Sequence, residues 1–168
     1  FDTLAWLIGS VGEPQAMTRT AIEQRPDCEG NMRPVDADDI ALINVDLGTH
    51  QGGTVAAQLA LSSVARNGRG CWIEIYGSEG SLVLGSENQK DYVHGFSLTL
   101  QQGGDSPRNV QPDEDLRFAT TWSDGRIAPV ARLQSWWANS IQKGHPMVPG
   151  LAEGLESQQA CDKTLLPR

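Results

Sequence analysis

Residues 71–84 read CWIEIYGSEGSLVL, in which two short runs of β-branched, aromatic and aliphatic residues flank a GSEG turn. Such runs are typical of strands, and the glycine-rich tetrapeptide between them favours a tight reversal of the chain. Ile73 and Ile75 occupy alternate positions, which places both side chains on one face of the first strand. The stretch therefore predicts an antiparallel hairpin.

The same alternation occurs on both sides of this hairpin. Ala41, Ile43, Val45 and Leu47 alternate with Leu42, Asn44 and Asp46. The GTHQGG turn that follows predicts a second hairpin, over residues 40–47 and 54–65. A further strand is expected at Phe96, Leu98 and Leu100, and residues 15–24 suit a partly exposed strand. Residues 25–37 and 101–115 are rich in turn-forming residues and are expected to be loops.

Three segments have the apolar spacing of amphipathic helices. The stripes are Leu4, Leu7, Ile8 and Val11, which stops near Gly12, and Val130, Leu133, Trp137 and Ile141. A last helix is expected from Pro149 or Gly150, with Leu151 and Leu155 facing inward. Helices at both ends with hairpins between them predict an α+β fold, an open, mostly antiparallel β-sheet with helices packed on one face. The open face of such a sheet usually meets another domain or subunit.

Length and composition narrow the possible functions. The 168 residues fit one domain, over residues 1–168. A net charge of −8, from 13 basic and 21 acidic residues, opposes binding to nucleic acid. No apolar run approaches the roughly 18 residues that a membrane span needs. Cys28, Cys71 and Cys161 are widely spaced without a CxxC pair, so we expect reduced thiols in a cytoplasmic protein.

Four blocks of sequence carry a family resemblance through their order and spacing. They are DTLAWLIGSVGEPQAM (2–17), PVDADDIALINVDLGTHQGGTV (34–55), WIEIYGSEGSLVL (72–84), and SWWANSIQKGHP (135–146) with GLAEGLESQQACDKTL (150–165). Together they resemble the carboxy-terminal domain of the Gfo/Idh/MocA oxidoreductases, a family that includes glucose-fructose oxidoreductase and inositol dehydrogenase. The resemblance covers nearly the whole chain, and ends at residues 164–168, which stop before the short final strand common in the family.

The resemblance implies a division of labour between two domains. Family members join an amino-terminal Rossmann domain, which binds NAD(H) or NADP(H), to a sheet domain that shapes the substrate pocket. The outer face of that sheet commonly forms dimers or tetramers. The family's catalytic lysine, in an EKP-like motif, and its Asp and His pair both precede Phe1. No G-x-G-x-x-G sequence is present to bind a dinucleotide.

The expected function follows from that division. This chain would be the substrate-binding and oligomerisation domain of an NAD(P)-dependent dehydrogenase that acts on a sugar, a polyol or a related hydroxy compound. The Rossmann domain is absent from the chain, which begins inside a helix and without methionine, as a fragment or processed product would. The isolated chain is expected to hold no NAD or NADP, to lack catalytic residues and to be inactive.

Asp2, Arg66, Asn67 and Arg69 are the candidate substrate-binding residues. By resemblance, Asp2 matches an aspartate of an H-x-x-D arrangement and would contact a substrate hydroxyl; it could equally stabilise the helix amino terminus. The corresponding family region of the loop around Arg66 and Asn67 faces the pocket. Its two arginines could hold a carboxylate or sugar hydroxyls, because a guanidinium is a fixed fork of donors. A solvated Asn-Gly turn is the alternative.

Other polar residues favour structural roles. Asp38 and Asp39 resemble paired carboxylates, as in a hydrolase, but their position at a strand entry favours solvated turn residues. His50, His94 and His145 lack metal-ligand spacing, so no metal site is expected. Trp136 and Trp137 are adjacent, so only one can face a core, and Trp137 fits better. A stand-alone dimerisation module without catalysis is the alternative function for the whole chain.

Overall fold

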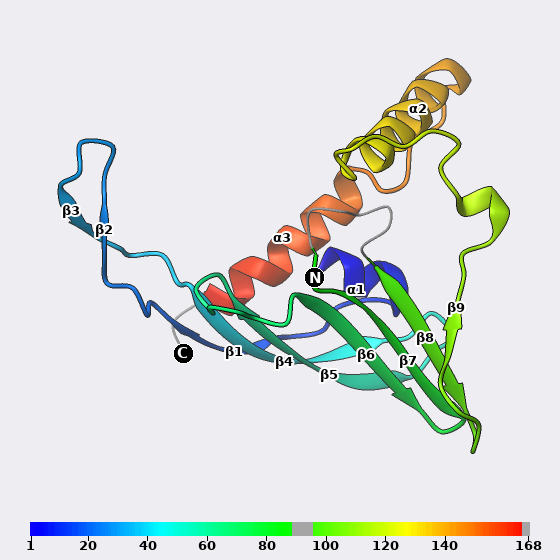
Figure 1. Ribbon diagram of the computed structural model, residues 1–168, viewed down its shortest axis with the longest axis horizontal. Coiled ribbons are helices and arrows are strands. Elements are labelled where there is room, and N and C mark those ends of the chain that lie inside the picture. Colours follow the sequence, from blue (N-terminus) through cyan, green and yellow to red (C-terminus); the bar gives the residue numbers. More distant parts are fainter. Residues whose placement is uncertain (89–95, 166–168) are drawn as a thin grey trace. The chain divides into compact units, whose positions relative to one another are not determined.

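The structure, a computed structural model, describes residues 1–88 and 96–165 (Figure 1). Its helices are α1 (Asp2–Leu7), α2 (Ile127–Lys143) and α3 (Leu151–Leu165), with a short 3₁₀ helix, η1 (Glu114–Leu116). Its strands are β1 (Gln15–Arg19), β2 (Gln24–Pro26), β3 (Met32–Pro34), β4 (Ile40–Gly48), β5 (Thr54–Ser62), β6 (Cys71–Gly77), β7 (Gly80–Ser86), β8 (Ser97–Gln102) and β9 (Arg108–Val110). The α+β class is confirmed.

Every strand pairing in the described residues is antiparallel, and the strands divide among three open sheets. The sheets have the orders β1-β4-β5, β2-β3 and β6-β7-β8-β9. The chain also divides into two compact units, Phe1–Arg66 with Val148–Arg168, and Asn67–Met147. Each unit is described below by itself.

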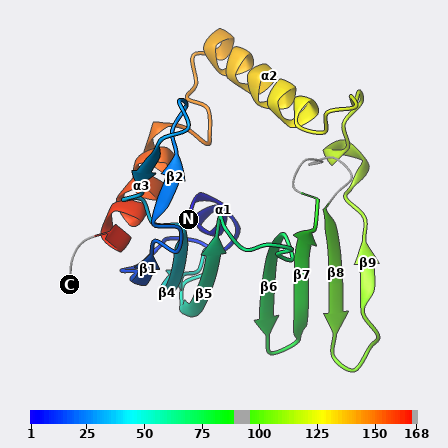
Figure 2. The ribbon, with the colours of Figure 1, turned by 60° about the vertical axis from the view of Figure 1, so that its left-hand side comes forward.

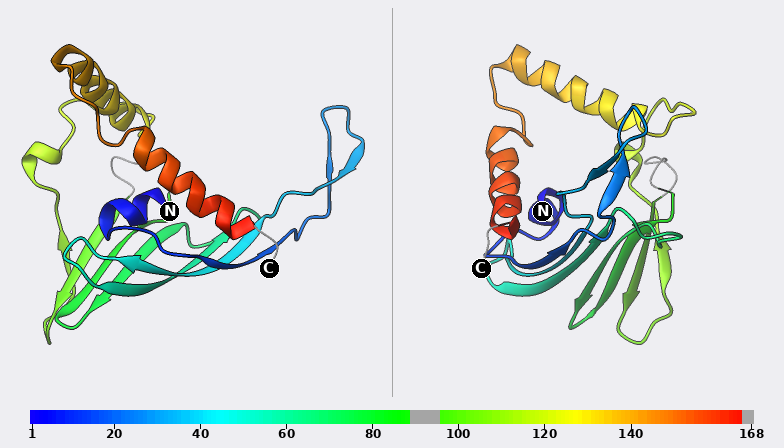
Figure 3. Two further views of the ribbon diagram at one scale, coloured as in Figure 1. Left: turned by 180° about the vertical axis from the view of Figure 1, so that it is seen from behind. Right: turned by 90° about the vertical axis from the view of Figure 1, so that its left-hand side faces the viewer.

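The core of the first unit is on one face of β4. Ile43, Val45 and Leu47 are buried, whereas the alternate residues of the strand, Leu42, Asn44 and Asp46, are exposed. Helices α1 and α3 cover that face, and α3 contacts both α1 and β1 (Figures 1 and 3). The predicted hairpin is confirmed, because β4 pairs with β5 from Ile40 with Ser62 to Gly48 with Thr54.

The segment after β1 was expected to continue as a strand to residue 24 and then as a loop to residue 37. Instead β1 ends at Arg19, and β2 and β3 form a short hairpin that projects from the sheet (Figure 1). The carboxylate of Asp27 closes its turn by accepting hydrogen bonds from the backbone N–H groups of Glu29 and Asn31, both at 2.9 Å. Polar contacts rather than apolar periodicity stabilise this hairpin, which explains why the loop expectation was wrong.

The first helix is shorter than its apolar stripe predicted. α1 ends at Leu7, and Gly9 has a φ of 143°, a left-handed value that favours glycine. The chain then turns alongside the end of β4, where Val11 and Leu47 form a β-bridge. Val11 therefore belongs to the sheet and not to the helical stripe.

The second unit contains the opening hairpin of the sequence. Ile73 pairs with Leu84 and Ile75 with Leu82, and β8 and β9 extend the sheet (Figure 2). The strand expected from Phe96 begins at Ser97. The loop expected over residues 101–115 is only partly a loop, because it contains β9 and the start of η1.

The two long helices, α2 and α3, occur where they were expected, but their large apolar side chains are exposed. Helix α2 ends at Lys143, close to the expected KGHP sequence, and Gly144, whose φ is 66°, forms a left-handed cap. Helix α3 begins at Leu151, one residue after the expected start. Trp137 is 62% exposed, however, and Leu151 is 95% exposed, so these side chains do not pack into a core of the described residues. The inward orientation expected for Trp137, Leu151 and Leu155 is therefore wrong here. His94 lies outside the described residues.

Candidate functional site

Asp2 is the first residue of α1, and its side chain is exposed. The carboxylate lies in the first helical turn, where the partial positive charge of the helix terminus stabilises an anion. Both interpretations of Asp2, a substrate contact and a helix-terminal charge, fit this position. Asp2 and Arg66 belong to the first unit, and Asn67 and Arg69 to the second.

The loop that carries the two candidate arginines is a tight turn. Arg66 and Asn67 are exposed, and Asn67 has a φ of 56°, an uncommon left-handed conformation for a residue other than glycine. Gly70 follows with a φ of 98° and lies against the backbone carbonyl of Ser86, so any side chain at residue 70 would collide with β7. This close contact holds the end of the loop against the end of β7.

Arg69 is held in place by two neighbours on β6, Trp72 and Glu74. Its guanidinium lies 4.1 Å from the centroid of the Trp72 ring and its Nη1 donates to Glu74 Oε1 at 3.2 Å. The indole N–H of Trp72 donates to the backbone carbonyl of Arg69 at 2.8 Å. Tyr76 Oη donates to the other carboxylate oxygen of Glu74 at 2.6 Å. We call these four residues the β6 cluster.

The charges of the β6 cluster support one another. The hydrogen bond from Tyr76, and then the Arg69 guanidinium, hold the pKa of Glu74 below its ordinary value. The same carboxylate raises the pKa of Tyr76 above its ordinary value. Glu74 is therefore a stable anion that orients Arg69. Its bond uses one of the five N–H donors of a guanidinium, so an arginine held in this way can also bind a hydroxyl or carboxylate.

Sequence reasoning identified Arg69 but did not single out Trp72, Glu74 and Tyr76 as a group. The available indication was their spacing, because residues 72, 74 and 76 of one strand point to the same face. Tyr76 is 74% exposed, which makes it an accessible aromatic surface. The alternative interpretation, a solvated Asn-Gly turn, fits the exposed Arg66 and Asn67, whereas Arg69 has side-chain partners on β6.

Asp38 and Asp39 do not form a carboxylate pair. Asp38 is exposed, whereas Asp39 is 7% exposed and accepts hydrogen bonds from the backbone N–H groups of Ala21 at 2.7 Å and Ile22 at 3.0 Å. The bond from Ala21 is the main cause of its lowered pKa, and Arg25 contributes from 3.8 Å. Asp39 is a structural anchor, so its interpretation as a solvated turn residue is corrected.

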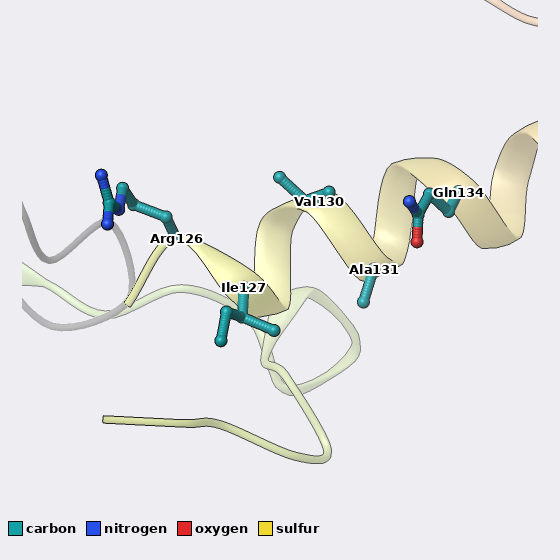
Figure 4. Close-up of a pocket in the computed structure, with 5 residues that line it drawn as sticks. All are labelled: Arg126, Ile127, Val130, Ala131 and Gln134. Carbon is teal, nitrogen blue, oxygen red and sulfur yellow. The ribbon is translucent and has the colours of Figure 1, made fainter. Parts of the chain in front are cut away.

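The surface at the start of α2 lacks convergent polar groups. A shallow hollow of about 240 Å³ lies on the first turns of α2, lined by Arg126, Ile127, Val130, Ala131 and Gln134. These side chains extend from one helix in different directions (Figure 4). Within residues 1–88 and 96–165, no three His, Cys, Asp or Glu side chains are grouped so that they could hold a metal ion. None of the helices described is both long and apolar enough to cross a bilayer.

Comparison with known proteins gives three findings. A family profile described as "Oxidoreductase family, C-terminal alpha/beta domain" matches residues 1–165. An uncharacterized oxidoreductase of Synechocystis is 42% identical over 166 residues, which is 98% of this chain and 44% of that protein. A crystal structure of an NAD binding oxidoreductase from Klebsiella pneumoniae superposes with a TM-score of 0.69 at 18% identity, covering 96% of this chain and 44% of that one. The last finding concerns the fold alone, and this chain spans less than half of either protein.

Proposed function

The chain belongs to the Gfo/Idh/MocA oxidoreductase family, of which it is a C-terminal alpha/beta domain, and we propose that it binds substrate in an NAD(P)-dependent dehydrogenase. The observation that carries the proposal is the family match over residues 1–165 of a chain that spans 44% of its Synechocystis relative. The remaining length of such a relative is enough for a separate nucleotide-binding domain. The substrate class that we propose is a sugar, a polyol or a related hydroxy compound.

The reaction assigns this chain a binding role. When an alcohol is oxidised, its carbon gives a hydride to the nicotinamide and its hydroxyl proton goes to a base, which leaves a carbonyl. By resemblance, the base and the cofactor site belong to the part of the enzyme that precedes Phe1. This chain would then bind and orient the hydroxyl compound, which is a large part of the barrier in a hydride transfer.

Asp2 and Arg69 are the residues that we propose for this binding. A carboxylate accepts hydrogen bonds from sugar hydroxyls, and a guanidinium donates to them. Arg69 is already oriented by Glu74 and Trp72, so contact with a ligand would cost little additional side-chain entropy. Arg66 and Asn67 are proposed as accessory contacts from the same loop.

We also propose that the outer face of the β1-β4-β5 sheet joins copies of this chain. The face opposite the buried core carries an apolar row that runs across the three strands, Met17, Leu42 and Ala60, which are neighbours in register. Beside it is a row of amides, Gln15, Asn44 and Gln58, in which Gln58 Nε2 donates to Asn44 Oδ1 at 3.2 Å. These side chains are all exposed, and an exposed sheet face with an apolar row is typical of subunit contacts.

A cytoplasmic location completes the proposal. The three cysteines of the chain, Cys28, Cys71 and Cys161, are free thiols and all are exposed. Exposed thiols persist in reducing compartments and tend to become oxidised elsewhere. The redox state of these thiols in cells, measured by alkylation before lysis, tests this part of the proposal.

The main experiment uses the full-length protein that contains this chain. The purified protein is mixed with NAD⁺ or NADP⁺ and with D-glucose, myo-inositol or other polyols, and the absorbance of the reduced nicotinamide is followed. We expect reduction with at least one of these compounds and none with residues 1–168 alone. Arg69→Ala should raise KM, whereas Arg108→Ala, a change of an exposed arginine on β9, should leave KM unchanged. A full-length protein that reduces neither cofactor with any polyol would contradict the proposal.

A further inference from the structure

The helix that carries Asp2 is joined to the turn between β4 and β5 by an unusually close backbone contact. Gly9 lies directly against the backbone carbonyl of Gly48, so that a Cβ atom at residue 9 would collide with it. Around this point the backbone N–H of Gly48 donates to the carbonyl of Ser10 at 2.8 Å, and that of Gly12 donates to the carbonyl of Asp46 at 2.9 Å. The end of α1 is therefore fixed to the most deeply buried strand of the first unit.

His50 extends this contact into the helix itself. Its backbone N–H donates to the carbonyl of Ile8 at 3.0 Å, and its ring Nε2 lies 3.2 Å from the carbonyl of Trp6. The last carbonyls of a helix have no partner within the helix, and a side chain from outside can satisfy them. His50 does so from the turn that follows β4, in a helix of six residues that has little stability of its own.

From this geometry we propose that His50 is a positioning residue, which holds α1 against the sheet and so sets where Asp2 is presented to substrate. The inference rests on the substrate-binding role proposed above for Asp2. We call Gly9, Gly48 and His50 the α1 latch.

The length of the helix shows why the latch matters. Residues 2 and 6 of a helix are separated by a rise of about 6 Å. A tilt of roughly 10° at the latch therefore moves Asp2 by about 1 Å, and a misplacement of that size at a reacting group can cost up to about 100-fold in rate. Because α1 is short and its first turn is exposed, the contacts at its carboxyl end determine the position of its amino end.

The experiment compares three variants of the full-length protein. His50→Leu removes the contact with the Trp6 carbonyl, His50→Gln keeps an N–H donor at nearly the same distance from the backbone, and Gln51→Leu changes an exposed neighbour in the same turn. Two effects are measured, with the affinity for the cofactor as a control. One is the hydrogen exchange of the Ala5 and Ile8 amides, which bond to the carbonyls of Phe1 and Leu4. The other is kcat/KM with D-glucose and myo-inositol, together with the Kd of the nicotinamide cofactor.

We expect His50→Leu to speed exchange at both amides and to lower kcat/KM about tenfold, with the cofactor Kd unchanged. His50→Gln should restore both quantities to within about threefold of wild type, and Gln51→Leu should change neither. Unchanged exchange in His50→Leu would overturn the inference, as would faster exchange with an unchanged kcat/KM. A wild-type protein inactive with all polyols would instead overturn the proposed function, while exchange would still decide whether the latch holds α1.

Discussion

Asp39 shows how one carboxylate can hold two segments of chain together. Its carboxylate oxygens accept hydrogen bonds from the backbone N–H groups of Ala21 and Ile22, which follow β1. Its own backbone N–H donates to the carbonyl of Arg19. The residue thus connects the entry of β4 to the base of the β2-β3 hairpin. Asp39 is buried and the two hydrogen bonds are partly buried, so loss of the charged acceptor would weaken this connection.

Replacement of Asp39 should therefore change how stability depends on pH. The folded-state pKa of Asp39 lies below the ordinary 3.8, so its stabilising effect is fully present above that value and is lost as the pH falls through the lower folded pKa. Asp39→Asn should lower the urea midpoint at neutral pH, and its difference from wild type should shrink in acid. Asp38→Asn, at the exposed neighbour, is the control and should show little change. A pH-independent difference for Asp39→Asn would contradict the role of its charge.

The pair formed by Glu74 and Tyr76 gives a second prediction for single residues. The Glu74 carboxylate accepts the Tyr76 hydroxyl and raises its pKa above the ordinary 10.0. Glu74→Gln should lower the Tyr76 pKa toward 10.0, because the charge that opposes ionisation is removed. The chain has two tyrosines, so the titration is followed by tyrosinate absorbance in a Tyr92→Phe background. Glu79→Gln, in the adjacent turn, should leave the pKa where it is; an equal fall in both variants would refute the specific pairing.

The candidate site could be predicted from sequence only at the level of the loop. The Asn-Gly turn and its two arginines were visible, because turn-forming residues and charges are local features. The partners of Arg69 could not be assigned, because they depend on which rotamers bring Trp72 and Glu74 toward the loop. The burial of Asp39 was not predicted, because nothing in a sequence of two adjacent aspartates indicates that only one of them is buried.

At the scale of elements, β4 has a core face and an outer face, and one leucine of the strand lies on each face. Leu47 is 2% exposed and Leu42 is 42% exposed. Leu47→Ala should destabilise the fold by about 2–5 kcal/mol, since it removes a fully packed side chain and leaves a cavity. Leu42→Ala should cost less than about 1 kcal/mol. Both values come from urea unfolding at a concentration low enough to exclude self-association; similar losses for the two variants would mean that the faces are assigned wrongly.

The elements that sequence predicted well are those stabilised by apolar periodicity. The β4-β5 and β6-β7 hairpins have alternating apolar residues and glycine-containing turns, and their pairing follows directly. All residues of β2 and β3 are exposed, and the hairpin depends on the Asp27 carboxylate, which bonds to Arg33 Nε at 3.0 Å as well as to its turn. Backbone geometry also limited α1, because a left-handed Gly9 ends the helix despite an uninterrupted apolar stripe.

At the scale of the whole molecule, the outer face of the first sheet is the surface on which the proposed assembly depends. Ala60 lies beside Leu42 in the apolar row, and an arginine in its place would put a charge into the proposed contact. Burying an unpaired guanidinium costs several kcal/mol, so Ala60→Arg should raise the Kd of self-association at least about 100-fold. Sedimentation equilibrium measures this directly. Gln51→Arg adds the same charge in the β4-β5 turn, away from the face, and should leave the Kd unchanged. If both variants assemble as the wild type does, the copies must meet through a different surface.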